Sequence, residues 1–270
     1  MVTKILFTAP ETYQPRLCMA MAEAQNSVIR PVFVPFITTF LYTKHTSFVE
    51  FCRVAASYDY VICSSMMAVR ALQSSGIEPS LLEGKVIAIG NDQKAVRDML
   101  GFDSIMQDAQ PSMMGIVDAL KYQPALSAKR IAVLMPEFTG LPVPSTITNF
   151  LNALSDTGAS VTNVYCYCTV AMGQEHYAKA VDYILEKEID AIAVTSGGEA
   201  HVLSKLLSFA VAQGQPIDVP IYSYGPYTTR CAQEASLPIA GTSPKYQSFK
   251  DFIDYLSTKL VINRLVHERP

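Results

Sequence analysis

The chain has 270 residues, of which 50% are hydrophobic. This length fits two domains of ordinary size better than one large domain, and the hydrophobic content is enough to fill two cores. Its net charge of −3 and its isoelectric point near 5.8 give no general attraction to nucleic acid or to an anionic membrane. We therefore expect no nucleic acid and no membrane as partners, and any anionic ligand must be held by local donors.

Cysteine and histidine show no spacing that is typical of a metal site. The six cysteines mostly lie inside apolar segments without CxxC pairing, which predicts buried, reduced thiols, and the four histidines are scattered. The chain opens on an apolar strand instead of a signal peptide, and no apolar run is long enough to span a bilayer. We therefore expect a cytoplasmic protein without a metal.

The first strand is predicted over residues 4–7, and a turn then leads to a helix over 16–24. A second strand covers 28–34. The segment 35–38 begins with Pro35 and is expected to be extended, because proline cannot continue a helix and restricts the residue before it. We place the first crossing between two domains here.

The middle of the chain alternates short apolar runs with helical patterns. Helices are predicted over 47–57, 68–74, 93–100, 113–121 and 145–156, strands over 60–63, 86–89 and 129–135, and a loop over 136–144. The alternating stretch 160–170 is expected to be an extended return crossing that runs beside residues 33–38.

Two β-turn-α units follow one another between residues 189 and 237. The first is a strand over 189–194, a polar turn over 195–198 and a helix over 199–212; the second is a strand over 219–224, a turn over 225–229 and a helix that starts over 230–235. Successive units of this kind imply parallel strands, whose turns all open at one edge of the sheet.

The same pattern occurs earlier in the chain, since residues 58–69 mirror the first unit and residues 85–95 mirror the second. This predicts an internal duplication and an α/β fold of two similar parallel-sheet domains, which could face each other across a cleft. The predicted boundaries are residues 1–35 with 171–270 for a discontinuous domain 1, 40–163 for an inserted domain 2, and 35–39 and 164–170 for the linker strands.

The order of several short motifs resembles the uroporphyrinogen-III synthase (HemD-like) family over nearly the whole chain. The motifs are Asp59–Ser65, Asp190–Ser196, the turn Gly225-Pro226-Tyr227-Thr228, the strand exit Thr8-Ala9-Pro10-Glu11, and the crossing strand Cys166-Tyr167-Cys168-Thr169-Val170. Each motif is short, and the resemblance rests on their shared order and spacing.

The resemblance implies a cofactor-free lyase of porphyrin and heme biosynthesis. Such an enzyme cyclises hydroxymethylbilane, a linear tetrapyrrole, to uroporphyrinogen III with loss of water and inversion of ring D. It further implies two flavodoxin-like domains joined by a two-stranded linker, with the small-molecule substrate between them. A cytoplasmic monomer that transiently contacts hydroxymethylbilane synthase would fit this family.

The resemblance also assigns roles to residues. Tyr167 matches the family tyrosine that assists departure of the hydroxyl, although it could instead be an amphipathic residue of a linker strand, and Tyr165 is an alternative phenol. Thr228 matches a carboxylate contact, or is a helix N-cap. The residues expected to bind substrate are Ser65, Gly90, Asn91, Ser196, Gly197, Gly198, Tyr227, Thr228 and Thr229.

Some positions depart from the family pattern. Gln93 stands where a threonine is usual, Ala9 stands where a basic residue is usual, and Met135-Pro136 replaces a common Arg-Gly pair. Lys94 and Lys245 could supply the lost positive charge. These departures leave open a non-catalytic two-lobed small-molecule binding homologue, whereas a Rossmann-type nucleotide enzyme is disfavoured because no strand is followed by GxGxxG.

Overall fold

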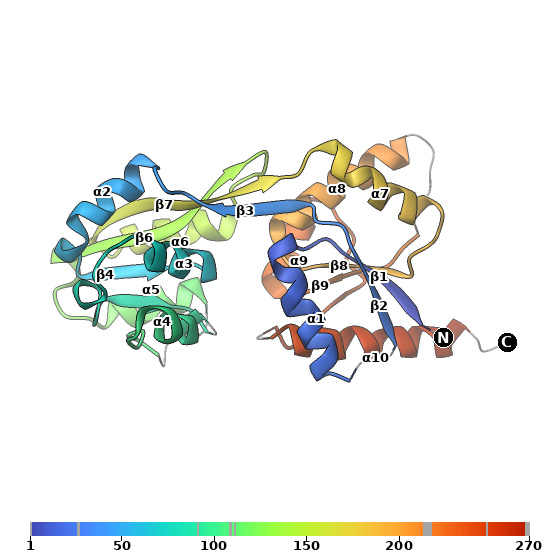
Figure 1. The fold of residues 1–270 in the computed structure, drawn as a ribbon, viewed down its shortest axis with the longest axis horizontal. Coiled ribbons are helices and arrows are strands. Elements are labelled where there is room, and N and C mark those ends of the chain that lie inside the picture. Colours follow the sequence, from blue (N-terminus) through green and yellow to red (C-terminus); the bar gives the residue numbers. More distant parts are fainter. Residues whose placement is uncertain are drawn as a thin grey trace. The chain divides into compact units, whose positions relative to one another are not determined.

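The computed structural model describes residues 2–25, 28–90, 92–107, 110, 112–212, 218–246 and 248–267. In this part of the chain, ten α-helices and ten strands form an α/β fold of two compact units (Figure 1). Unit 1 consists of Met1–Thr38, Gly140–Pro142 and Val170–Pro270, and unit 2 consists of Thr39–Thr139 and Val143–Thr169.

Unit 1 is built on a five-stranded sheet in the order β10-β9-β8-β1-β2, and each neighbouring pair is parallel. Its strands are β1 (Thr3–Phe7), β2 (Ile29–Phe33), β8 (Ala191–Val194), β9 (Ile221–Ser223) and β10 (Gly241–Thr242). Its helices are α1 (Gln14–Glu23), α7 (Gln174–Leu185), α8 (Gly197–Ala212), α9 (Pro226–Glu234) and α10 (Phe249–His267). A short 3₁₀ helix over Glu11–Tyr13 precedes α1.

Alternation along the strands sends neighbouring side chains into two cores on opposite faces of this sheet. Leu6 and Ile192 pack with residues of α7, α8 and α9 on one face. Ile5 and Ala191 pack with residues of α1 and α10 on the other. Because both faces are covered, the strands are apolar throughout, as is usual for parallel sheets.

Unit 2 is built on a second five-stranded sheet in the order β3-β7-β6-β4-β5. Its strands are β3 (Ile37–Leu41), β4 (Tyr60–Cys63), β5 (Val86–Ala88), β6 (Arg130–Thr139) and β7 (Ser160–Ala171). Its helices are α2 (Thr46–Val54), α3 (Met66–Ser74), α4 (Asp92–Leu100), α5 (Met113–Lys121) and α6 (Ser145–Ser155). Short 3₁₀ helices cover Ala55–Ser57, Pro79–Leu81 and Leu126–Ala128. Residues of α2, α3 and α4 cover one face, and residues of α5 and α6 cover the other.

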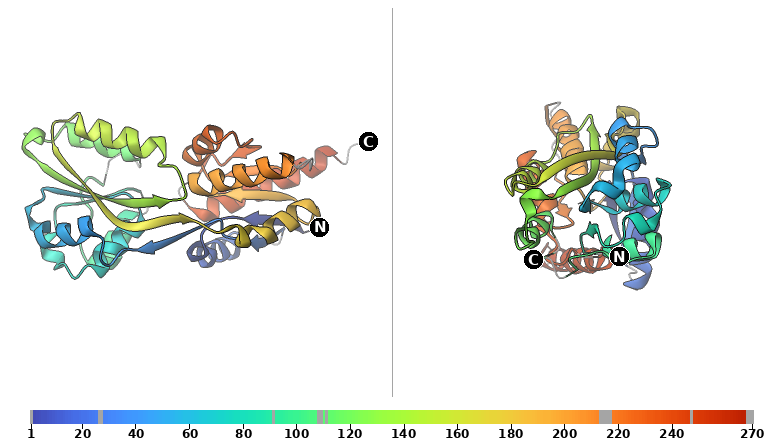
Figure 2. Two further views of the ribbon diagram at one scale, coloured as in Figure 1. Left: turned by 90° about the horizontal axis from the view of Figure 1, so that it is seen from above. Right: turned by 90° about the vertical axis from the view of Figure 1, so that its left-hand side faces the viewer.

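Strands β3 and β7 are neighbours and run side by side (Figure 2). The backbone N–H of Tyr42 donates to the carbonyl of Cys166 at 2.9 Å, and that of Met172 donates to Phe36 at 3.0 Å. The residue numbers rise in one strand as they fall in the other, so the pair is antiparallel. Both strands continue past the boundary between the units, at Thr38/Thr39 in β3 and at Thr169/Val170 in β7.

Several predicted boundaries were wrong, and three of them have a clear physical cause. The loop expected over 136–144 is strand as far as Thr139, since β6 lies beside the long strand β7. Helix α8 begins at Gly197, inside the predicted turn 195–198. Helix α9 begins at Pro226, inside the predicted turn 225–229, because Gly225 is an extended N-cap and proline is well tolerated at the first helical position.

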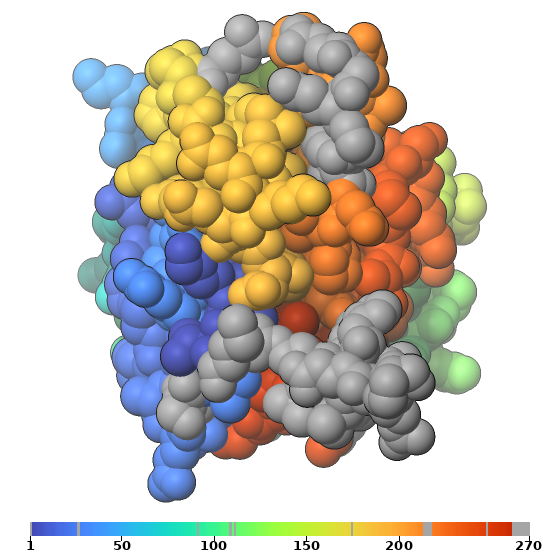
Figure 3. All heavy atoms as spheres, turned by 90° about the vertical axis from the view of Figure 1, so that its right-hand side faces the viewer, coloured from blue at the N-terminus to red at the C-terminus, as the bar shows by residue number. Residues whose placement is uncertain are grey.

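The two aspartates of the repeated motif lie at the amino ends of their strands. The Oδ2 atom of Asp59 accepts from the backbone N–H of Arg130 at 2.8 Å, and Oδ1 accepts from Lys129 Nζ at 2.9 Å. Asp190 Oδ2 accepts from the backbone N–H of Lys4 at 2.7 Å. In Figure 3 the gold segment near residue 190 lies against the blue N-terminal segment. Each aspartate therefore ties two parallel strands together.

We predict that Asp59→Asn destabilises unit 2 by about 1 kcal/mol at pH 7, since the substitution removes the charge that strengthens the hydrogen bonds from the Arg130 N–H and from Lys129 in a partly exposed position. The Arg130 N–H, with Lys129, lowers the pKa of the Asp59 carboxyl. This stabilisation is therefore complete above the ordinary carboxyl pKa and is lost as the pH falls through the lowered value.

The measurement is the thermal unfolding midpoint by circular dichroism, where we expect a decrease of about 3 °C at pH 7 that shrinks in acid. Asp118→Asn is the control, because Asp118 pairs with Lys121 on the exposed surface of α5. An equal decrease for both variants, or one that grows in acid, would contradict the assigned role of Asp59.

Candidate functional site

The carboxyl end of β4 brings two predicted site residues together. Ser65 follows β4 and is the N-cap residue of α3, yet its side chain makes no capping bond to that helix. Instead its hydroxyl donates to the phenol oxygen of Tyr167 at 2.8 Å. Tyr167 lies in β7 and is only 5% exposed. The simple turn or capping explanation therefore does not account for the Ser65 side chain.

The alternative phenol, Tyr165, has different surroundings. Its ring packs edge-on against His45, with the ring centroids 5.5 Å apart, and contacts the core formed with α5 and α6. Tyr167 belongs to the core formed with α2, α3 and α4. In the described part of the chain, the Tyr167 phenol accepts a hydrogen bond from a predicted site residue, whereas the Tyr165 phenol does not.

The turn after β5 holds the next predicted position. Gly90 has a positive φ of 51° and accepts a hydrogen bond from the backbone N–H of Gln93 at 3.1 Å, so it begins the turn into α4. Asn91 lies outside the described residues. The Gln93 side chain reaches the carbonyls of Ala88 and Gln107 at 3.4 Å, which gives it a structural role where the family usually has threonine.

In unit 1, the turn between β8 and α8 surrounds a fully buried carboxylate. Glu199 is 0% exposed. Its Oε1 accepts from the hydroxyls of Thr195 and Ser196 at 2.7 and 2.8 Å. Its Oε2 accepts from the Thr8 hydroxyl and from the Thr195 backbone N–H, both at 2.9 Å. Burial raises the pKa of Glu199, and these four hydrogen bonds act in the opposite direction.

Glu199 is a residue that the sequence analysis missed. It stands three positions after Ser196, and the backbone N–H of Glu199 in turn approaches the Ser196 hydroxyl at 3.4 Å. This arrangement is related to the capping box, in which a serine before a helix is paired with a glutamate three residues later. The spacing Ser196-x-x-Glu199 was therefore the signal that could have located both the start of α8 and this carboxylate.

The two predicted glycines at the start of α8 differ in how closely they are packed. A Cβ atom at Gly197 would lie 2.7 Å from the Cβ and Sγ atoms of Cys231 in α9, which is too close. A Cβ atom at Gly198 would lie 3.3 Å from the end of the Leu141 side chain, a tight contact that a small shift of that side chain would relieve. Packing therefore explains the glycine at position 197 without a ligand.

The hydroxyls at the start of α9 also have partners within unit 1. Thr228 is 2% exposed and lies inside α9, where its hydroxyl donates to the carbonyl of Thr195 at 3.1 Å, so it is not the N-cap. Thr229 Oγ1 is 2.5 Å from the Ser223 hydroxyl and 2.7 Å from that of Thr242. Tyr227 is 40% exposed. The two threonine hydroxyls are therefore engaged within unit 1, whereas the Tyr227 side chain is partly exposed at this strand end.

Other kinds of site are not found in the described part of the chain. It holds no cluster of three or more histidine, cysteine, aspartate or glutamate side chains able to bind a metal. Within the same residues, no helix has the length and apolar character needed to cross a membrane. A shallow hollow in unit 2 is lined by Lys121, Leu126, Ala153, Asp156 and Thr157. It includes none of the predicted site residues, and its segments lie before the amino ends of β6 and β7.

The positions of Ser65, Gly90, Ser196 and Tyr227 share a structural context. Each lies at the carboxyl end of a strand, where the next helix begins. Backbone N–H groups at helix N-termini favour anions, and ligands of open parallel sheets bind at this edge. The buried phenol of Tyr167 adds a proton donor at the edge of unit 2. This combination suits an anionic small molecule and an acid-assisted step.

A family profile described as Uroporphyrinogen-III synthase HemD matches residues 20–250 of the chain. No curated protein sequence matches it significantly. Among solved structures, a mutant uroporphyrinogen III synthase from the bacterium Thermus thermophilus is 16% identical with a TM-score of 0.60, over 96% of this chain and 100% of that one. Uroporphyrinogen-III synthetase from Helicobacter pylori is 11% identical with a TM-score of 0.52, over 95% of this chain and 100% of that one.

Structural similarity at such low identity shows the shared fold. The profile match adds the family, because it extends over most of the chain and includes the strand ends that carry Ser65, Tyr167 and Ser196. The chain belongs to the uroporphyrinogen-III synthase family.

Proposed function

We propose that this protein is a uroporphyrinogen-III synthase, a lyase that cyclises hydroxymethylbilane to uroporphyrinogen III with loss of water and inversion of ring D. The family match supports the reaction class. The observation that carries the proposal within the structure is the hydrogen bond from Ser65 to the buried phenol of Tyr167 at the carboxyl end of β4.

Tyr167 is the proposed proton donor to the departing hydroxyl group of the substrate. Because the Ser65 hydroxyl donates to the phenol oxygen, one lone pair of that oxygen is occupied and the phenol O–H is polarised as a donor. Burial of the phenol strengthens such a hydrogen bond, since little water competes for it. The phenol thereby gives its proton to the departing hydroxyl group, which leaves as water, and the resulting phenolate regains a proton when the cationic azafulvene loses its pyrrole N–H proton.

The second task of the site is to hold the tetrapyrrole so that ring D attacks through its substituted carbon, because unguided closure gives the other isomer. We assign carboxylate binding to the predicted residues Ser65, Gly90, Asn91, Ser196, Gly197, Gly198, Tyr227, Thr228 and Thr229. Since the threonine hydroxyls have internal partners, backbone N–H groups of the helix N-termini are the proposed donors.

We also propose that the two units arose by duplication. In unit 1 the first four strands in chain order are β1, β2, β8 and β9. Numbered 1 to 4 in that order, they lie side by side in the sheet as 2-1-3-4. In unit 2, β4, β5, β6 and β7 lie in the same order. With β10 in the fifth place, unit 1 has the complete flavodoxin-like order, whereas β3 borders β7 in unit 2.

The reaction is tested by generating hydroxymethylbilane in situ with its own synthase, adding this protein, oxidising the products and separating the type I and type III isomers. The proposal predicts type III product that increases with the amount of protein. Only the type I isomer, formed spontaneously in the presence of well-folded protein, would contradict it and would favour a non-catalytic binding homologue.

We predict that Tyr167→Phe lowers kcat about 100-fold and changes KM less than about threefold, because the phenol proton acts mainly in the transition state. Steady-state kinetics of type III formation would measure both constants. Tyr165→Phe is the matched control and should keep kcat within about threefold. If the two variants behave alike, or if Tyr167→Phe raises KM as much as it lowers kcat, Tyr167 is a packing residue.

A further inference from the structure

One arginine at the carboxyl edge of unit 1 lies against two aromatic rings. Arg16 is exposed in the first turn of α1, which follows the carboxyl end of β1. Its guanidinium carbon is 5.4 Å from the centre of the Tyr13 ring and 4.9 Å from that of Phe249. Stacking of this kind restricts the orientation of the guanidinium group while its N–H donors remain at the edge of the plane.

The rings beneath Arg16 are themselves fixed. Tyr13 and Phe249 lie 5.6 Å apart between ring centres, and Tyr224 packs against Phe249 at 5.3 Å. Phe249 is 9% exposed and is the first residue of α10. These residues follow β1, β9 and β10, so the cluster gathers at the strand ends from three separate parts of the chain.

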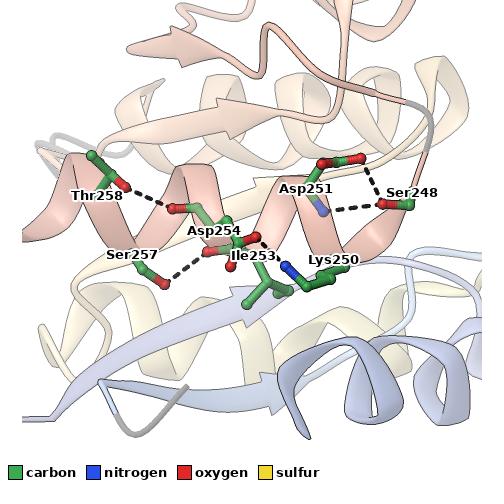
Figure 4. Close-up of polar contacts among 7 residues, drawn as sticks. All are labelled: Ser248, Lys250, Asp251, Ile253, Asp254, Ser257 and Thr258. Carbon is green, nitrogen blue, oxygen red and sulfur yellow. Dashed lines mark hydrogen bonds and ion pairs between the residues drawn. The ribbon is translucent and has the colours of Figure 1, made fainter. Parts of the chain in front are cut away.

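The start of α10 is held by side-chain hydrogen bonds (Figure 4). The Ser248 hydroxyl donates to Asp251 Oδ2 at 2.7 Å and accepts from the Asp251 backbone N–H at 3.1 Å. One turn on, Lys250 pairs with Asp254 at 2.7 Å. The capped first turn fixes the backbone at Phe249 and thereby the surface on which Arg16 rests.

Arg16 has no ion pair with any residue that the structure describes, although Glu11 lies on the same edge. Arg97, by comparison, pairs with Asp103 at 2.5 Å. A guanidinium that is oriented by aromatic rings and lacks a carboxylate partner matches the planar, bidentate geometry of an incoming carboxylate.

The neighbouring turn, between β8 and α8, already contains a carboxylate. At the start of α8, the Glu199 carboxylate already takes the hydrogen bonds of Thr8, Thr195 and Ser196. A second anion at these groups would face a buried carboxylate. The edge of unit 1 therefore favours an anion near α1 over one at the side chains around Glu199.

We propose that Arg16 binds a carboxylate of the tetrapyrrole substrate, with Tyr13 and Phe249 orienting the guanidinium group. The assignment rests on the proposed function for the identity of the polycarboxylate. It also explains how the edge retains a cation although Ala9 stands where the family usually has a basic residue. Since the carboxylate takes no part in the bonds that form and break, Arg16 stabilises the substrate and the transition state alike.

The test compares Arg16→Gln and Arg16→Lys with Arg30→Gln in the full-length protein. Arg30 is an exposed arginine of the same unit near the amino end of β2. This control therefore removes the same charge at the opposite edge of the sheet. One readout is KM and kcat for type III formation. The other is the Kd of uroporphyrin III, the oxidised form of the proposed product, from fluorescence titration.

We expect Arg16→Gln to raise KM and the uroporphyrin Kd about tenfold while kcat stays within about twofold, as for a lost charge-assisted bidentate contact. Arg16→Lys keeps the charge but loses the planar fork, so an increase of about threefold is expected. Arg30→Gln should bind like the unchanged protein. Thermal unfolding midpoints identify any variant that fails to fold. If Arg16→Gln fails to fold, the KM and the uroporphyrin Kd of Arg16→Lys decide whether Arg16 binds the carboxylate.

The outcomes separate the two proposals. If the unchanged protein makes type III product but Arg16→Gln keeps its KM and uroporphyrin Kd, the role of Arg16 is refuted and the synthase assignment stands. If Arg16→Gln and Arg30→Gln weaken binding equally, the effect is one of net charge and the specific contact is wrong. If no type III product forms, the synthase assignment fails, while the uroporphyrin Kd still tests Arg16.

Discussion

Parallel pairing of the central strands is the constraint on which the candidate site depends. Among the parallel strands of both sheets, it sends the strand-to-helix turns to the carboxyl edge and the incoming loops to the amino edge. Asp59 and Ser65 are close in sequence, yet β4 lies between them and separates their roles. The aspartate ties strands together, whereas the serine reaches a buried phenol.

Much of the fold could be predicted from hydrophobic patterns. The strand over Tyr60–Cys63 and the helix over Met113–Lys121 were predicted with their observed bounds, because apolar spacing and terminal polar residues mark both. The starts of α8 and α9 were missed. A glycine-rich segment reads as a turn, but the Ser196 and Glu199 pair and the proline at the start of α9 allow each helix to begin earlier.

The candidate site was harder to predict, because its decisive contacts join residues far apart in the chain. The type of residue at Thr228 suggested either a ligand contact or a cap, and neither describes its bond to the Thr195 carbonyl. Similarly, nothing in the local sequence of Arg16 shows that Phe249 lies beneath it. Ser65 and Tyr167 were both selected on family motifs, but their hydrogen bond could be seen only in the structure.

We propose that Ser65 acts through the phenol of Tyr167, and a double-mutant cycle on kcat for type III formation measures the coupling between the two residues. It needs Ser65→Ala, Tyr167→Phe and the double variant, with Ser74→Ala as a control at the end of α3, where the Ser74 hydroxyl donates to carbonyls of that helix. We expect Ser65→Ala to lower kcat about fivefold alone and to add almost nothing once the phenol is absent. Multiplicative losses in the double variant would show that the two residues act independently and would refute this coupling.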